Sequence, residues 1–99
     1  MSTPFPSEPL HADIIWTEED NERNGQTYGI WFEDIRSGFA RLHVRVAVAG
    51  PDDFIALIEV EGMIFEVRCR VDMSLRILAA DVATTDAKQT FHKTLSQRG

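Results

Sequence analysis

The chain of 99 residues is long enough for one domain with a single core and too short for two. Its hydrophobic fraction of 43% excludes a wholly disordered chain, and no apolar run reaches the roughly 18 residues of a membrane-spanning helix. Ten basic and sixteen acidic residues give a net charge of −6, which argues against nonspecific binding to nucleic acid or to an anionic membrane.

The N-terminal part of the chain carries signals for location and domain bounds. Residues 1–10 hold three of the four prolines and predict a flexible lead-in, so that residues 11–99 form a single small β-rich domain. No basic start followed by an apolar stretch marks a signal peptide, and the single cysteine, Cys69, excludes an internal disulfide. We therefore expect a cytoplasmic protein.

Two short segments precede the alternating apolar pattern that begins at Gln26. Residues 11–16 include Ile14, Ile15 and Trp16 and predict a short strand or an anchored segment. Residues 17–25 are polar throughout and predict a loop. Its acidic residues, with Asp13, indicate either a solvated surface or a contact with a basic partner.

From Gln26 onward, apolar residues recur with the period of two that is typical of strands. Tyr28–Ile35 and Phe39–Ala49 are predicted to pair as a hairpin around a three-residue turn. This register places Trp31 opposite His43 on an outward face, with the apolar residues of both strands on the other face.

A second hairpin is predicted for Phe54–Val60 and Met63–Val71, with Ile58 opposite Phe65 and every pair on that face apolar. The alternative is a helix over residues 51–61, with a proline at its first position and a glycine after its end. β-Branched residues and the paired register favour the strands, and the alternative stays open.

The C-terminal third predicts one more strand, Leu75–Val82, and then a change of period. Ala87, Phe91 and Leu95 recur every four residues, which indicates an amphipathic helix capped by Thr84 or Thr85. The predicted fold class is therefore α+β, mainly β: an antiparallel meander of about five strands with one C-terminal helix.

The first candidate site is an arginine-rich outward face of the sheet. It comprises Trp31, Arg41, His43, Arg45, Arg68, Arg70 and Arg76. Guanidinium groups bind oxyanions and an indole offers a stacking surface, so this face suits a phosphate, a carboxylate or a base. The alternative is an ordinary solvated face on which Glu33 and Glu59 offset the arginines. The predicted pairing places Arg70 directly opposite Arg76, and two like charges in that position are unfavourable unless an anion lies between them.

The second candidate site is an apolar patch on the same face, made of Ile55, Leu57, Ile64 and Leu78. Such a patch needs a cover. Either the C-terminal helix covers it, or a partner protein or a second copy of the chain does. If the helix fails to cover it, we expect a two-fold homodimer.

The sequence gives little support for an enzymatic function. The histidines His11, His43 and His92 have no metal-ligand spacing, so we expect no metal and no cofactor. No phosphate-binding loop and no nucleophile motif is present, and Cys69 falls on the inward face. The resulting hypothesis is a non-enzymatic protein-binding module, an adaptor or a small inhibitor. The alternative is ligand or nucleic-acid binding through the Trp31 and arginine face, with nucleic acid the less expected ligand and no membrane contact.

Overall fold

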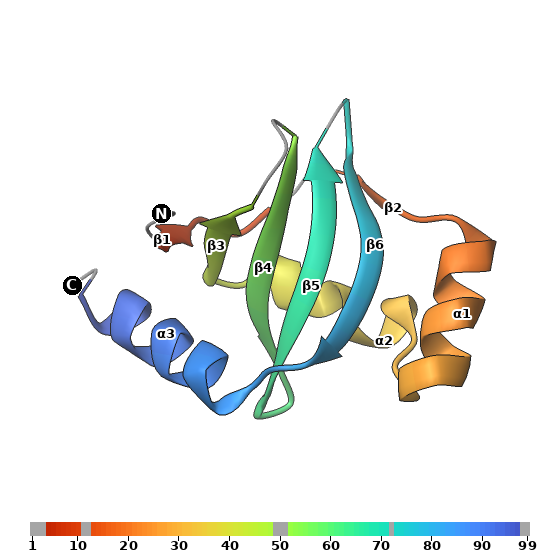
Figure 1. Ribbon diagram of the computed structural model, residues 1–99. Coiled ribbons are helices and arrows are strands. Elements are labelled where there is room, and N and C mark those ends of the chain that lie inside the picture. The colour runs from red at the N-terminus through yellow and green to blue at the C-terminus, as the bar shows by residue number, and fades with distance from the viewer. Residues whose placement is uncertain (1–3, 11–12, 49–51, 72, 98–99) are drawn as a thin grey trace.

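The computed structural model describes residues 4–10, 13–48, 52–71 and 73–97. A six-stranded sheet in the order β1-β3-β4-β5-β6-β2 forms the centre of the molecule (Figure 1). Its strands are β1 (Phe5–Ser7), β2 (Ile14–Ile15), β3 (His43–Ala47), β4 (Asp53–Val60), β5 (Met63–Val71) and β6 (Leu75–Val82). The helices are α1 (Glu18–Tyr28), α2 (Phe32–Ile35), the 3-10 turn η1 (Arg36–Ala40) and α3 (Thr85–Ser96).

The α+β class with a C-terminal helix is confirmed, but the purely antiparallel meander is wrong. The short strand β2 pairs in parallel with β6, so the sheet is mixed. Strand β1 pairs antiparallel with β3, so the predicted flexible lead-in contains a strand of the sheet. Within the described residues, no helix has the length and apolar character needed to cross a membrane.

The predicted second hairpin is confirmed with its register, because β4 and β5 pair Ile58 with Phe65 and Phe54 with Cys69. Glu61 and Gly62 form the turn with φ values of 52° and 82°. Positive φ at both positions matches the twist of the flanking strands. The helical alternative for 51–61 is therefore wrong, although residues 49–51, like His11, lie outside the described residues.

The predicted first hairpin is wrong. Of its two predicted strands only the second forms, as β3. The predicted first strand contains the end of α1 and the whole of α2, and η1 replaces the predicted turn and the start of the second strand. Phe32, Ile35 and Phe39 also fit a helical spacing. These three side chains are at most 2% exposed and cover one face of the sheet. Their burial across the sheet outweighed the alternating pattern of the isolated segment.

The polar segment predicted as a loop forms helix α1 instead. Thr17 caps it, with the Asp20 N–H donating to the Thr17 hydroxyl at 3.1 Å, and acidic residues occupy the first turn, where the helix dipole favours them. The helix buries asparagines rather than an apolar stripe. Asn24 accepts a hydrogen bond from the Ala80 N–H and donates one to the Ile30 carbonyl, both at 2.8 Å, so α1 covers the edge of β6.

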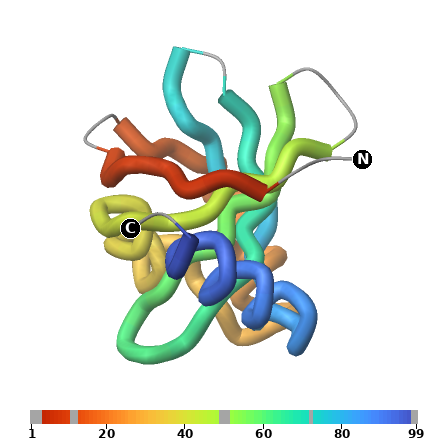
Figure 2. The backbone as a smooth tube through the Cα atoms, turned by 90° about the vertical axis from the view of Figure 1, so that its left-hand side faces the viewer, coloured from red at the N-terminus to blue at the C-terminus, as the bar shows by residue number. Residues whose placement is uncertain are grey.

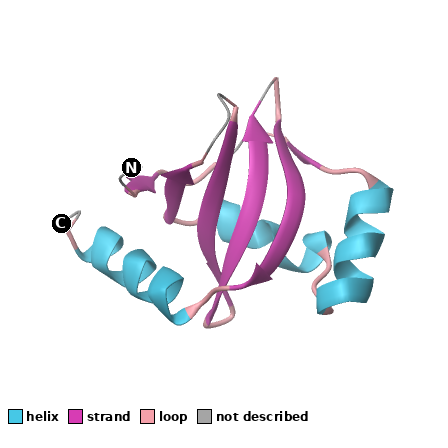
Figure 3. Ribbon diagram, viewed as in Figure 1, coloured by secondary structure: helices cyan, strands magenta, loops and turns pink. Residues whose placement is uncertain are grey.

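Helices cover both faces of the sheet, as Figure 3 shows by element type. The main core lies between the sheet and α2–η1. A smaller core lies under α3, which crosses the β1, β3 and β4 side of the sheet in Figure 2. Thr84, one of the two predicted caps, caps α3: its hydroxyl accepts from the Ala87 N–H at 3.2 Å. Consequently, both faces of β3 are covered.

Candidate functional site

The structure does not bring the predicted arginine face together. His43 is wholly buried and faces the main core, so its predicted outward position is wrong. Trp31 precedes α2, and its ring packs against Gly25 of α1, where an added Cβ would lie 2.4 Å from the ring. Arg41 precedes β3 and forms an ion pair with Glu59 at 3.8 Å.

Arg68, Arg70 and Arg76 do share one sheet face, and each has an acidic partner. Asp53 accepts from Arg70 Nε at 2.8 Å and lies 3.8 Å from Arg68. The hydrogen bond from Arg70 holds the pKa of Asp53 below its usual value. Arg76 is directly opposite Arg70, as predicted, and it pairs with Asp20 at 3.4 Å. Carboxylates of the chain therefore supply the counter-charge that this pair of arginines needs.

Arg45 differs from the other predicted arginines in the sheet face it occupies and in its lack of an ion pair with a described residue. It lies opposite Ala56 in the register and so shares the core face of the sheet, away from the other strand arginines. Its guanidinium carbon lies 4.5 Å from the centre of the Phe54 ring. Burial lowers the pKa of Arg45, and no carboxylate of the described residues forms an ion pair with it.

Most of the predicted apolar patch lies beneath α3. Leu57 and Ile64 are 2% and 5% exposed in the smaller core, and Ile55 packs against that core. The helix, one of the two alternative covers, therefore occupies this surface. Leu78 is separate from the other three and lines a hollow beside α1.

In the described part of the chain, the Cys69 thiol is unsuited to act as a nucleophile and no cluster of side chains could hold a metal ion. The Cys69 thiol is buried and donates to the Val67 carbonyl at 3.5 Å, and burial raises its pKa to about 12. A thiol with that pKa is protonated at neutral pH and a poor nucleophile. The described ranges contain no group of three or more His, Cys, Asp or Glu side chains able to hold a metal ion.

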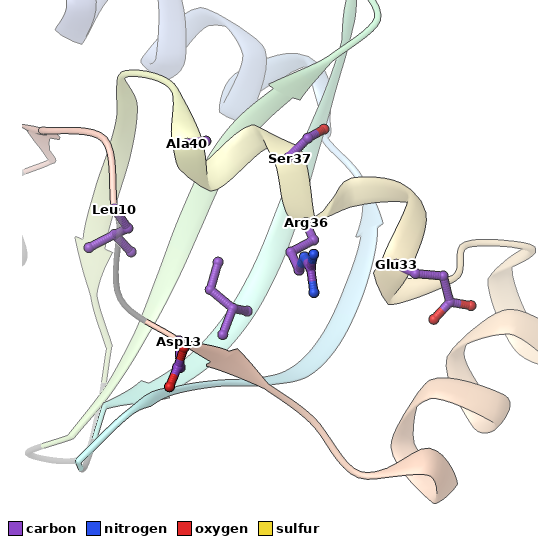
Figure 4. Close-up of a pocket in the computed structure, with 7 residues that line it drawn as sticks. Leu10, Asp13, Glu33, Arg36, Ser37 and Ala40 are labelled. Carbon is purple, nitrogen blue, oxygen red and sulfur yellow. The ribbon is translucent and has the colours of Figure 1, made fainter.

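A hollow of about 500 Å³ lies between the segment before β2 and the α2–η1 turn (Figure 4). Its lining comprises Leu10, Asp13, Ile14, Glu33, Arg36, Ser37 and Ala40. Arg36 lies between Asp13 and Glu33 in this view, and all three side chains are exposed. Because hydrated surface charges bind ligands weakly, this hollow is a poor candidate for a specific site.

A groove of about 190 Å³ at the β4–β5 turn is the better candidate, and sequence reasoning missed it. We call it the Trp31 groove; it is lined by Gly29, Ile30, Trp31, Asp34, Ile35, Val60, Glu61, Met63 and Phe65. Met63 is 50% exposed. Asp34 and Glu61 are exposed at the groove, and neither forms an ion pair with any described residue.

The charge of the chain is concentrated in the segment that supplies one wall of this groove, residues 29–31 and 34–35. Residues 13–34 hold seven acidic residues and one basic residue, a balance of −6, and the other nine acidic and nine basic residues cancel. Helix α1 carries most of these acids, and Arg23 pairs only with Glu19 and Asp20. The sequence predicted the acidic cluster of this region as a solvated surface or a contact with a basic partner, but it gave no sign of the groove.

Comparison of the chain with known protein families, with characterised proteins and with solved structures finds no match.

Proposed function

We propose that this chain is a non-enzymatic protein-binding module that takes up a basic segment of its partner, with an apolar side chain of that segment in the Trp31 groove. The supporting observation is an apolar groove bordered by two carboxylates that form no ion pair with a described residue, with one wall at the end of the acidic segment 13–34. An adaptor and a small inhibitor both use such a surface.

The groove offers the two kinds of contact that a short peptide segment needs. Trp31 and the half-exposed Met63 provide an aromatic wall and an adaptable thioether for one apolar anchor. Lysine or arginine residues beside that anchor would meet Asp34 and Glu61. Their attraction to the acidic α1 region would mainly speed association and select the partner.

The proposal favours a different protein over a second copy as the partner. Helix α3 already buries Leu57 and Ile64, which removes most of the apolar surface that a homodimer would use. A copy of this chain also brings a like charge of −6 to the contact. The proposed location is the cytoplasm, where the single buried thiol needs no oxidised partner.

Fluorescence of Trp31 tests the proposal directly, in a Trp16→Phe background that leaves one indole. The probe is a short peptide with a central leucine flanked by lysines, and its control has glutamates in place of the lysines. We expect only the lysine peptide to shift the emission, with weaker binding as salt rises. No shift, or equal shifts from both peptides, would contradict the proposal.

Neutralising the two groove carboxylates adds a matched comparison. Asp34→Asn with Glu61→Asn should weaken peptide binding by about tenfold; asparagine also tolerates the positive φ at position 61. Glu18→Gln with Glu22→Gln removes the same charge from exposed positions of α1 and should weaken binding less. Equal losses in the two variants would indicate nonspecific attraction rather than a groove.

A further inference from the structure

A second hollow, of about 300 Å³, opens where β1, β3 and β4 lie side by side. Its lining comprises Phe5, Arg45, Ala47, Asp52, Asp53, Phe54 and Val71. Phe5 sits directly across from Arg45 in the β1–β3 register. Phe5 and Val71 are 48% and 38% exposed, so large apolar side chains border an arginine that faces the core side of the sheet.

No carboxylate of the described residues lies within ion-pair distance of Arg45. Its Nε is buried without a hydrogen-bond partner, whereas Arg68 and Arg70 both lie within ion-pair distance of Asp53. The Phe54 ring stacks on the guanidinium but cannot accept its N–H bonds in the plane of the group. Arg45 is half-buried, and partly desolvated charges in proteins are usually paired, so the side of its guanidinium that faces the hollow is suited to an anion.

We propose that this hollow binds an organic monocarboxylate, with the carboxylate on the guanidinium of Arg45 and an apolar body against Phe5 and Val71. A planar guanidinium accommodates a carboxylate through two parallel hydrogen bonds. The Phe54 ring packs on one side of the Arg45 guanidinium, which restricts the orientation of its N–H groups before a ligand binds. This site is independent of the Trp31 groove and does not require a protein partner.

The acidic residues of the hollow select for a single negative charge. Asp53 is largely neutralised by Arg70 and Arg68. Asp52 is exposed, and the charge of Arg70 partly offsets it. The repulsion from Asp52 grows with the charge of the ligand, so it disfavours a doubly charged anion more than a singly charged one. Inorganic phosphate, with a higher charge and no apolar body, fits the hollow less well.

His43 provides an internal reporter of an anion at Arg45. Burial is the main cause that lowers the pKa of His43, the hydrogen bond to the Arg41 carbonyl opposes it, and the charge of Arg45 lowers it further. A bound carboxylate offsets the charge of Arg45. The imidazole should then protonate at a higher pH when the site is filled.

The test is a titration of the full chain with hexanoate, followed by backbone and imidazole NMR signals. We expect saturable shifts at β1, β3 and β4 and a raised pKa of His43, while hexylamine and inorganic phosphate leave these signals unchanged. Arg45→Met keeps an apolar stem over Phe54 and should lose at least about tenfold in affinity. Arg36→Met, which removes an exposed arginine that forms no ion pair with a described residue, should bind as the wild type does.

Three results would overturn the assignment. They are no saturable shift with hexanoate, equal binding of phosphate, or equal hexanoate binding by Arg45→Met. The comparison of hexanoate with hexylamine and phosphate uses the wild-type chain, so it decides the matter even where the Arg45 variant fails to fold. A peptide response at the Trp31 groove has no bearing on these results.

Discussion

The β4–β6 sheet and the α1–η1 region are stabilised in different ways. In the sheet, alternating apolar side chains such as Ile58 and Val67 are wholly buried against their cross-strand neighbours. In α1, the buried residues are Asn21, Asn24 and Gly25. An apolar layer spreads its contribution over many contacts, whereas a polar anchor depends on a few hydrogen bonds with strict geometry.

A few hydrogen bonds from the two asparagines of α1 fix the position of this helix. Asn21 accepts from the Phe32 N–H and donates to Glu33, both at 2.8 Å, which fixes the start of α2. Asn24 joins α1 to the edge of β6. A helix without an apolar stripe can therefore be held in place when its polar side chains satisfy buried backbone groups.

The largest expected effect is in the sheet. Phe65→Asp should leave the chain unfolded at 25 °C, because it places an unpaired charge in the main core. Loss of the cooperative thermal transition in circular dichroism checks this. Met63→Asp, on the same strand but 50% exposed, should stay folded. Similar melting of the two variants would contradict the burial of Phe65 in the main core, since both side chains share one face of β5.

Asn24→Ala tests the polar anchor and should cost about 2 to 4 kcal/mol of unfolding free energy. The variant leaves the Ala80 N–H and the Ile30 carbonyl without their partner. Urea denaturation measures the loss, and Thr27→Ala, an exposed position on the same helix, is the control. If the two variants lost equal stability, the hydrogen bonds of Asn24 would not be what holds α1.

Gly25→Ala should cost about 1 to 3 kcal/mol, since the new methyl group overlaps the Trp31 ring and forces it to move. In the Trp16→Phe background, the emission of Trp31 should change with it. Gly29→Ala meets no atom within 4 Å but strains a φ of 72°. It should lose about 1 kcal/mol and keep the tryptophan emission of the parent, which separates packing from backbone strain.

The smallest effect concerns pH. The pKa of His43 is lowered in the folded state, so folding favours the neutral ring. The unfolded chain then binds the proton first, and stability is lost as pH falls below about 6.5, the ordinary value, and through the folded pKa. Asp53, whose pKa is also lowered, loses its contribution only at more acidic pH, below its ordinary value of 3.8.

Urea denaturation at pH 7 and pH 5 checks this sign. Wild type should lose more stability than His43→Gln between the two values, because glutamine does not titrate. An equal or smaller loss in wild type would mean that His43 is not held neutral by its burial.

The sequence alone determined the β4–β5 register, the strand β6 and the helix α3. In the β4–β5 hairpin the paired register favoured strands over the helical alternative, because every slip of register would expose a full set of apolar side chains. The stripe of Ala87, Phe91 and Leu95 predicted the apolar face of α3, which packs on the smaller core. Local chemistry and packing agree there, so the pattern was sufficient.

Tertiary structure decided the rest, because the deciding contacts are distant in sequence. Phe32 and Ile35 fit both a strand and a helix, and the sheet face that needed a cover selected the helix. Both faces of β3 are covered, so alternation could not tell whether Val44 or His43 pointed to the main core. The sequence predicted Trp31 and Arg45 as candidate binding residues. Only the fold could place Met63 beside the first and Phe5 beside the second, since strand pairing and the packing of α1 bring those surfaces together.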